Sequence, residues 1–247
     1  MSGEERSVDL PVPASALAIG AHADDAEFGC GATLAKWAAA GATVHFLVLT
    51  DGSKGSWDAG TDLASLVAER RREQEKAASA LGIAEVLFSD FVDGELGNGP
   101  AERAHVCEVI RTVRPEVVLG HDPWARYRLH PDHRAAGFLV TDGIVAARDP
   151  HFFPDQGIPP HRPERLLLFE AEQPDHFETI DRFLDSKVAA LLCHRSQWVN
   201  TMKIDPDGPD ADTQRDAFAA RVGDVAAAAG APAGLALAET FRLLEDL

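Results

Sequence analysis

The sequence ALAIGAHADDAE, residues 16–27, joins a short apolar run to a cluster of one histidine and three acidic residues. Residues 16–21 are small and apolar, which is typical of a buried strand. Helix-forming residues follow at 31–40, and Gly41 stands where a glycine that ends a helix is expected. A strand, a polar turn and a helix in this order indicate a βα unit.

The same order repeats along the first half of the chain. Further strands are predicted at residues 43–50, 85–88 and 116–120, and further helices at 63–81, 101–113 and 132–147. This alternation indicates parallel strands that are joined by right-handed crossovers, with helices on both faces of the sheet. We therefore predict an α/β fold with a Rossmann-like, mostly parallel sheet. Ligands of such sheets bind at the carboxyl ends of the strands.

The second half of the chain is less regular. The sequence predicts loops at residues 151–162 and 201–212, a strand at 165–170, and helices at 180–193 and 216–229. Because no long linker interrupts the chain, residues 1–247 are predicted to form a single domain. The core of this domain is expected at about residues 15–150. An irregular C-terminal cap, which extends the sheet or covers it, is expected at about residues 151–247.

Composition excludes several classes of function. The 247 residues include 23 Lys and Arg and 40 Asp and Glu, which gives a formal net charge of −17 at pH 7. Such a charge argues against binding to nucleic acid or to an anionic membrane. The three cysteines form no Cys-x-x-Cys pair, and there is no signal-peptide pattern or apolar run of membrane-spanning length. These features predict a cytoplasmic protein.

The first polar cluster follows the first predicted strand directly. His22 and Asp25 are three residues apart there, so their side chains can converge on one cation. The alternative is that Asp24 or Asp25 caps the next helix. This cluster alone does not separate the two interpretations.

The second cluster, His130-Pro131-Asp132-His133, follows the fourth strand and its loop. Pro131 suits the first position of a helix, which places His130 near the cap and His133 on the same helix face. The alternative here is a capping loop with solvent-exposed histidines.

Both clusters are predicted at the same edge of the sheet. His22, Asp25 and His133 together have the composition of a catalytic zinc site, which leaves one coordination position open. Asp24 and His130 then lie beside the metal, where water needs a base and a leaving amine needs an acid.

Three motifs carry a resemblance to a known family. AHADDAEFGCGATLAKW (residues 21–37), TDGSKGSWD (50–58) and HPDHRAAG (130–137) resemble the LmbE/PIG-L family of zinc-dependent N-deacetylases, also called N-acetylglucosaminyl deacetylase-like proteins. The likeness continues through Arg70-x-x-Glu73, Asp93-Gly94-Glu95, and residues 121–124 and 194–197, so that it covers most of residues 15–200.

The resemblance implies a role for each residue of the two clusters. The zinc ligands would be His22, Asp25 and His133. Asp24 would be the general base that takes a proton from the zinc-bound water. The remaining pair, His130 and Asp132, would have supporting catalytic roles: His130 would stabilise the tetrahedral intermediate or protonate the amine, and Asp132 would orient His130 or the metal shell.

The resemblance also implies substrate contacts. Arg70 and Asp93 match positions that contact sugar hydroxyls in sugar-deacetylating members, and His194 and Gln197 belong to a segment that approaches the site. The sequence departs from the family at the residue that would stabilise the oxyanion of the tetrahedral intermediate. Some members have a tyrosine there that helps polarise the carbonyl, whereas this chain has Arg128, with Tyr127 next to it. A positive Arg128 would suit a developing oxyanion. Arg128, Tyr127 and His130 therefore remain alternatives for that role.

The predicted function is removal of an N-acetyl group from an amino sugar or sugar conjugate, by hydrolysis of a linear amide C–N bond with Zn²⁺. Fe²⁺ or another divalent ion fits the same ligands. The alternatives are an amidase that cleaves a thiol-sugar conjugate, and a non-catalytic module that binds metal and sugar. A nucleotide-dependent oxidoreductase is disfavoured, since Leu34 stands where the dinucleotide motif needs glycine. The family resemblance also allows a homotrimer or hexamer.

Overall fold

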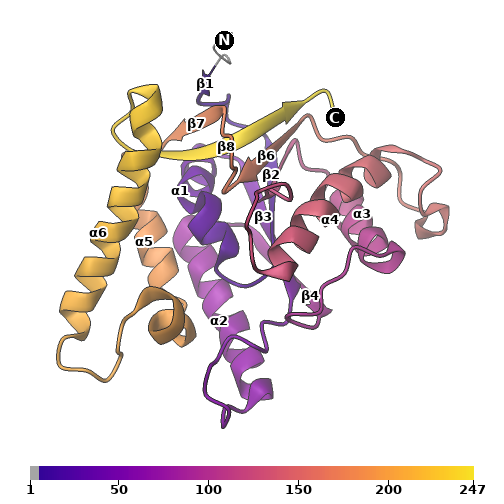
Figure 1. The fold of residues 1–247 in the computed structure, drawn as a ribbon. Helices are drawn as coiled ribbons and strands as arrows, with labels where there is room; N and C mark the ends of the chain where they lie inside the picture. The colour runs from indigo at the N-terminus through magenta and orange to yellow at the C-terminus, as the bar shows by residue number, and fades with distance from the viewer. Residues whose placement is uncertain (1–5) are drawn as a thin grey trace.

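The computed structural model describes residues 6–247 (Figure 1), and its core is one sheet with the strand order β1-β7-β8-β6-β5-β2-β3-β4. Every neighbouring pair is parallel except the two pairs that β8 makes with β6 and β7. The strands are β1 (Ser7–Val8), β2 (Ser15–Gly20), β3 (Thr43–Thr50), β4 (Glu85–Phe91), β5 (Val117–His121), β6 (Arg165–Phe169), β7 (His176–Thr179) and β8 (Ala238–Glu245). This mostly parallel sheet confirms the predicted fold class.

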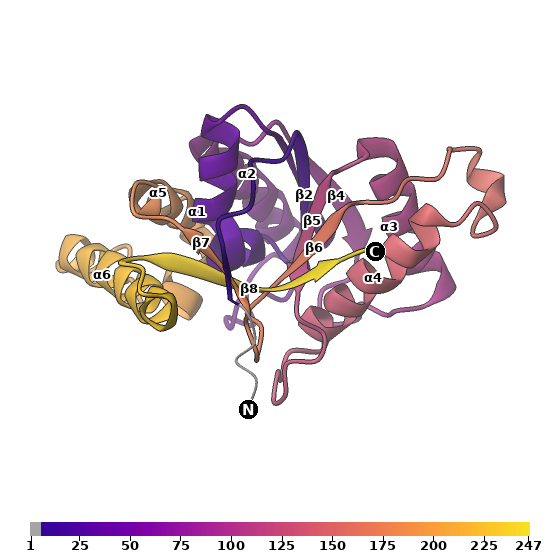
Figure 2. The same ribbon diagram turned by 90° about the horizontal axis from the view of Figure 1, so that it is seen from above.

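Helices cover both faces of the sheet. Figure 2 shows α3 and α4 on one face, α1, α2 and α5 on the other, and α6 outside α5. The helices are α1 (Asp25–Ala39), α2 (Leu63–Leu81), α3 (Pro100–Val113), α4 (Pro131–Arg148), α5 (Leu184–Leu192) and α6 (Ala211–Gly230), with short helical turns at Pro154–Gln156, Arg195–Gln197, Trp198–Met202 and Ala231–Ala233. Among the described residues, no helix is both long enough and apolar enough to cross a membrane.

The central strand β2 divides the core into two layers. Alternate residues of a strand point to opposite faces of the sheet. Ala16 and Ala18 accordingly pack in the cluster under α1 and α2, whereas Leu17 and Ile19 pack in the cluster under α3 and α4. All four side chains are completely buried. Burial on both faces explains why residues 16–19 of this strand are all apolar rather than alternating.

The structure differs from the sequence prediction mainly in the second half. The C-terminal half both extends the sheet, through β6, β7 and β8, and covers it with α5 and α6. The strands β1, β7 and β8 were not predicted. In the first half, α1 begins at Asp25, six residues before the predicted start at residue 31. The difference arises because α1 is broken at Cys30, whose φ of −149° is not helical, and two glycines flank that residue.

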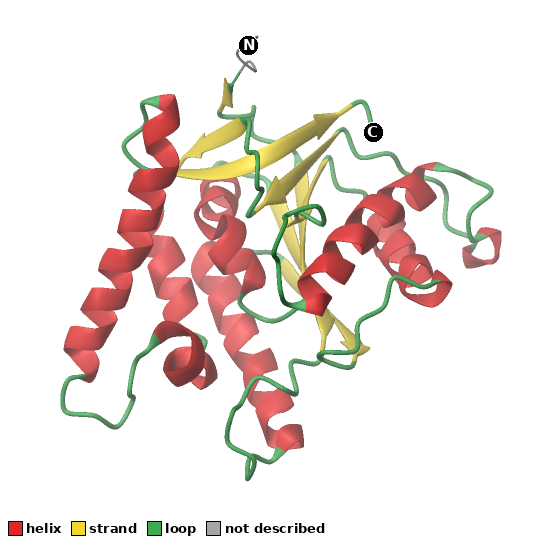
Figure 3. Cartoon of the chain, viewed as in Figure 1, coloured by secondary structure: helices red, strands yellow, loops and turns green. Residues whose placement is uncertain are grey.

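Four loops bring polar residues to one edge of the sheet. These loops follow β2, β3, β4 and β5, which are parallel neighbours in the order β5-β2-β3-β4. They are among the green segments of Figure 3. Because the carboxyl ends of parallel strands meet at the same edge, residues far apart in the sequence come together there.

Candidate active site

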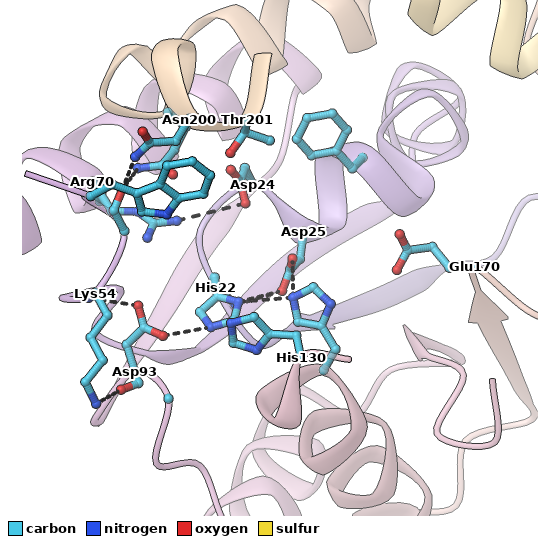
Figure 4. Close-up of a pocket in the computed structure, with 16 residues that line it drawn as sticks. His22, Asp24, Asp25, Lys54, Arg70, Asp93, His130, Glu170, Asn200 and Thr201 are labelled. Carbon is cyan, nitrogen blue, oxygen red and sulfur yellow. Dashed lines mark hydrogen bonds and ion pairs between the residues drawn. The ribbon is translucent and has the colours of Figure 1, made fainter. Parts of the chain in front are cut away.

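The three predicted metal ligands lie side by side. His22 follows β2, Asp25 begins α1, and His133 is in the first turn of α4. The Asp25 carboxylate oxygens lie 3.5 Å from His22 Nδ1 and 3.3 Å from His133 Nε2, and these two ring nitrogens are 3.2 Å apart (Figure 4). Three overlapping groups of side chains have possible metal-ligand atoms within 4.8 Å of one another. They are His22-His130-His133, Asp25-His121-His133 and His22-Asp93-Asp132.

The turn after β2 fixes Asp25 against this cluster. Asp25 Oδ2 accepts the backbone N–H of His22 at 2.8 Å. A Cβ on Gly20 would lie 3.0 Å from the Cβ of Asp25, so the close approach favours glycine at this position. Asp24 is the N-cap residue of α1, but its side chain makes no capping hydrogen bond. The capping interpretation of Asp24 is therefore wrong, and its carboxylate is available for another role.

The second nitrogen of His22 faces two carboxylates. Nε2 lies 3.1 Å from Asp93 Oδ1 and 3.2 Å from Asp132 Oδ2. Donation of the Nε2 proton leaves the Nδ1 lone pair directed at Asp25 and His133, which is the arrangement of metal-binding histidines with a carboxylate behind them.

The charges around His22 favour a positive charge at this site. Burial lowers the pKa of the His22 imidazole, but hydrogen bonds with Asp132, Asp25 and Asp93 outweigh it and raise the pKa to about 12. Three carboxylates around one ring thus stabilise a positive charge, and a divalent metal supplies that charge as a proton does. The nitrogen and oxygen donors present fit zinc or a similar ion.

Asp132 connects the cluster to the loop after β4. Its buried carboxylate accepts the backbone N–H groups of Gly94 at 2.6 Å and Leu96 at 3.3 Å. Burial raises its pKa, but the hydrogen bonds from His22 and Gly94 outweigh this and lower it. The resemblance implied that Asp132 orients His130 or the metal shell, and its closest partner among the histidines is His22.

Asp24 is held in a strained conformation beside the cluster. Its φ of 88° lies in the left-handed region, which costs a non-glycine residue about 1–3 kcal/mol. Its backbone N–H donates to Gln74 Oε1 at 3.0 Å, and Gln74 Nε2 donates to Glu27 Oε1. Burial raises the pKa of the Asp24 carboxyl to about 6, against the opposing charges of Arg70 and His194. Its nearest cation, the Arg70 guanidinium, is 4.0 Å away. A buried carboxylate that is only loosely paired can accept a proton near neutral pH.

The predicted substrate contacts fall into two groups. Arg70, Asp93 and Gln197 line a cavity of about 510 Å³ beside the histidines. The Arg70 guanidinium also donates to the carbonyl oxygens of Gly52 and Ala23, at 3.0 and 2.9 Å, and so holds two loops of the site.

His194 and Arg128 do not line this cavity. His194 is completely buried, with Nε2 3.4 Å from Glu27 Oε1. Arg128 forms an ion pair with Glu170, and its Nε lies 3.3 Å from His133 Nδ1. Both residues therefore contact groups that surround the site rather than the cavity itself.

His130 faces the cavity, whereas Tyr127 is 90% exposed and does not line it. The His130 ring lies 4.7 Å from the His22 ring and 4.8 Å from the His133 ring. Burial, together with the charges of these two rings, lowers the pKa of His130. Of the three alternatives for an oxyanion or amine contact, His130 is the one that reaches the cavity.

His121 was not predicted as a site residue, although it was part of a quoted motif. It ends β5, and its Nε2 lies 3.1 Å from Asp25 Oδ2. Its Nδ1 lies 3.2 Å from Glu170 Oε2, and its ring stacks on His133 at 4.4 Å. The available signal was its position at the carboxyl end of a strand that neighbours β2. Other residues of the cavity wall that were not predicted are Phe28, Lys54, Gly55, Gly94, Glu170, Asn200 and Thr201.

Comparison with known proteins gives consistent likenesses. The family model described as "PIG-L: GlcNAc-PI de-N-acetylase" matches residues 17–144. Diacetylchitobiose deacetylase of Thermococcus kodakarensis is 35% identical over 185 residues, which are 74% of this chain and 69% of that protein. The 4-oxalmesaconate hydratase of Pseudomonas putida is 29% identical over 206 residues, 78% of this chain and 77% of that protein. The solved structure of N,N'-diacetylchitobiose deacetylase from Pyrococcus horikoshii has a TM-score of 0.84 at 28% identity, and covers 94% of this chain and 84% of that one.

Proposed function

This chain belongs to the GlcNAc-PI de-N-acetylase (PIG-L) family, and from that premise we propose that it is a metal-dependent hydrolase that removes the N-acetyl group of an amino sugar or sugar conjugate. One observation supports this most directly. The donor atoms of His22, Asp25 and His133 converge within 3.5 Å of one another, next to the loosely paired Asp24.

The proposed ligands are His22, Asp25 and His133, and Zn²⁺ is the proposed metal, with Fe²⁺ as the alternative. When bound, the ion polarises the amide carbonyl and acidifies water. Asp24 accepts the proton of the attacking water, because burial keeps its pKa near the range in which a base works. His130 reaches the same cavity and donates to the carbonyl oxygen or to the departing amine.

Asp132 and Asp93 support the metal side of the reaction by holding His22. Their hydrogen bonds to Nε2 keep Nδ1 turned toward the other two ligands. Arg70, Lys54 and Gln197 also line the cavity, and they are hydrogen-bonding groups suited to sugar hydroxyls.

The partner we propose is thus a small N-acylated sugar. The net charge of −17 disfavours nucleic acid, as the sequence predicted. The three unpaired cysteines favour the cytoplasm. A homotrimer or hexamer stays a prediction.

A metal and activity assay tests the proposal. The protein is stripped with a chelator, reloaded with Zn²⁺, and incubated with N,N'-diacetylchitobiose and N-acetylglucosamine while free amine is measured. About one metal per chain and amine release are expected. Asp24→Asn should retain the metal and lose about 10²–10⁴-fold in kcat. The matched control is Asp90→Asn, an exposed partner of Arg71, which should keep full activity.

Two results would overturn this proposal. One is full activity of the Asp24→Asn variant with metal bound, which would remove the base. The other is a metal-loaded protein that releases no amine from any N-acyl sugar but hydrates 4-oxalmesaconate, the compound in the name of the Pseudomonas putida relative. Release of amine from a thiol-sugar conjugate alone would favour the amidase alternative.

A further inference from the structure

A second cavity of about 430 Å³ adjoins the proposed active site. It lies along α6, between that helix and residues of α1 and β8, and we call it the α6 groove. Phe28, Glu170 and Thr201 line both the α6 groove and the active-site cavity. Because the two spaces share these walls, one ligand can extend from the first into the second.

Most of the residues that line the α6 groove are small or apolar. Phe28 and Phe218 meet edge to face with ring centroids 6.3 Å apart, and Val225 on α6 is 70% exposed. The other small or apolar lining residues are Gly29, Val222, Ala226, Ala229 and Ala238. An apolar ligand would remove this surface from water, which is favourable in proportion to the area buried.

The charged residues in the wall of the α6 groove are already paired. Lys187 donates to Glu239 at 2.6 Å and to the carbonyl oxygen of Phe28 at 2.7 Å. Glu239 also accepts the backbone N–H groups of residues 32 and 33, beyond the break in α1. Arg221 donates to the carbonyl oxygen of Met202. These groups therefore offer little to a polar ligand.

The metal ligands separate the α6 groove from the polar part of the active site. Asp93 contacts Nε2 of His22, whereas Glu170 contacts His121, which in turn contacts Asp25. Figure 4 shows Lys54 and Asp93 on one side of His22, and Glu170 on the opposite side of Asp25. A substrate whose amide lies at the metal, with its sugar hydroxyls near Asp93, has its acyl carbon directed toward the groove.

We infer that the α6 groove holds the acyl chain of the substrate, so that the enzyme also hydrolyses N-acyl amino sugars whose linear acyl group is longer than acetyl. This inference rests on the proposed function. In the reaction, a water oxygen forms a bond to the acyl carbon and the C–N bond breaks. The amide nitrogen, which carries one hydrogen, takes up both protons of that water, and the products are a carboxylate and the ammonium form of the amino sugar.

Chain length is the variable that tests the inference. kcat/KM is measured for methyl glycosides of N-acetyl-, N-butanoyl- and N-hexanoylglucosamine. A fully buried CH₂ group is expected to raise kcat/KM roughly fourfold. Since the α6 groove is partly open, we expect kcat/KM to rise about twofold per CH₂ group, which is more than tenfold from the acetyl to the hexanoyl compound. Calorimetry on the Asp24→Asn variant should show the same order of affinities without turnover.

Val225→Asp places a charge in the α6 groove at an exposed position, where the fold tolerates it. The ratio of kcat/KM for the hexanoyl and acetyl compounds should fall to about one. The matched control is Val199→Asp, because Val199 is 62% exposed and lines neither cavity. This control should keep the ratio of the unsubstituted protein.

Several outcomes would overturn the inference. Equal kcat/KM for all chain lengths, or equal effects of Val225→Asp and Val199→Asp, would leave the α6 groove without a role in acyl binding. A preference for long alkyl glycosides at constant N-acetyl would assign the groove to an aglycone instead. Dissociation of an oligomer by Val225→Asp, seen in sedimentation, would assign it to a second copy of the chain. If no N-acyl compound releases amine, including the N-acetyl one, the proposed function itself fails.

Discussion

Gln74→Leu tests whether the geometry of Asp24 depends on a side chain that lies outside the active-site cavity. Gln74 is 1% exposed, and its amide is held from both sides. The carbonyl oxygen accepts the N–H of Asp24 at 3.0 Å, and the amide nitrogen donates to Glu27. Leucine has a similar size but removes both hydrogen bonds.

The magnitude follows from the groups that lose their partners. The Asp24 N–H loses its hydrogen bond, and the completely buried Glu27 keeps only His194, at 3.4 Å. Unsatisfied buried groups cost about 1–3 kcal/mol each, so we expect unfolding to become about 2–4 kcal/mol easier. Asp24 would also be free to leave its left-handed conformation, where φ is 88°. A displacement of about 1 Å costs on the order of 10²-fold in rate, so kcat should fall about 10–100-fold.

The assay combines urea unfolding, metal content and kcat. The metal content should stay near that of the unsubstituted protein, since Gln74 contacts none of the three proposed ligands. Gln156→Leu is the matched control, because Gln156 also bonds on both sides, to Arg111 and to the carbonyl oxygen of Ala104, far along the chain from the site. It should lose stability and keep kcat. A Gln74→Leu variant with unchanged kcat would refute the reasoning, as would one whose kcat loss equals that of the control.

Three further predictions concern charge and packing. Asp24 must be ionised to act as a base, and burial raises its pKa to about 6 in the absence of a metal, which would lower it. We therefore expect kcat/KM to decrease as the pH falls through an apparent pKa at or below about 6. A pH–rate profile in which kcat/KM rises toward acid pH would contradict the assignment of Asp24 as the base. Asp132→Asn removes a carboxylate that contacts Nε2 of His22, and it should weaken zinc affinity about 10–100-fold. The affinity is measured by competition with a chromophoric chelator. An unchanged Kd for zinc would show that Asp132 does not affect metal binding through His22. A Cβ at Gly137 would lie 2.7 Å from the carbonyl oxygen of His121. Gly137→Ala should therefore lower the free energy of unfolding, measured by urea titration, by about 1–3 kcal/mol. An unchanged free energy of unfolding would mean that α4 can shift away from β5 without cost.

The sequence predicted best where local and tertiary preferences agree. The apolar, β-branched run at Thr43–Thr50 forms β3 with the predicted bounds, because both faces of that strand are packed by helices. The amphipathic helix α2 spans Leu63–Leu81 as predicted, and Gly82 ends it in the left-handed conformation that glycine adopts without strain. Each of these elements is specified by its own residues.

Other elements depend on partners that are far away in the sequence. The strand β8 mixes apolar residues with Glu239 and Arg242, and it forms because β6 and β7 lie on either side of it. The left-handed conformation of Asp24 has no local signal, since it is held by Gln74, fifty positions later. His121 becomes a site residue only because β5 pairs with β2 in register, which brings the end of one strand next to the turn after the other.

Asp93 links the proposed substrate-binding side of the site to the proposed metal ligands. The family resemblance implied a sugar contact, and Asp93 does line the cavity, yet its Oδ1 also bonds to His22 and its Oδ2 accepts the N–H of Lys54. Asp132 likewise joins His22 to Gly94 in the next loop. A cation at the proposed site would therefore offset the negative charges of Asp93 and Asp132, and so stabilise the loops that these two carboxylates contact. It follows that the wall of the proposed sugar-binding side is ordered by the same carboxylates that orient the proposed metal ligand His22. Substitution of Asp93 should consequently change metal affinity and KM together, rather than KM alone.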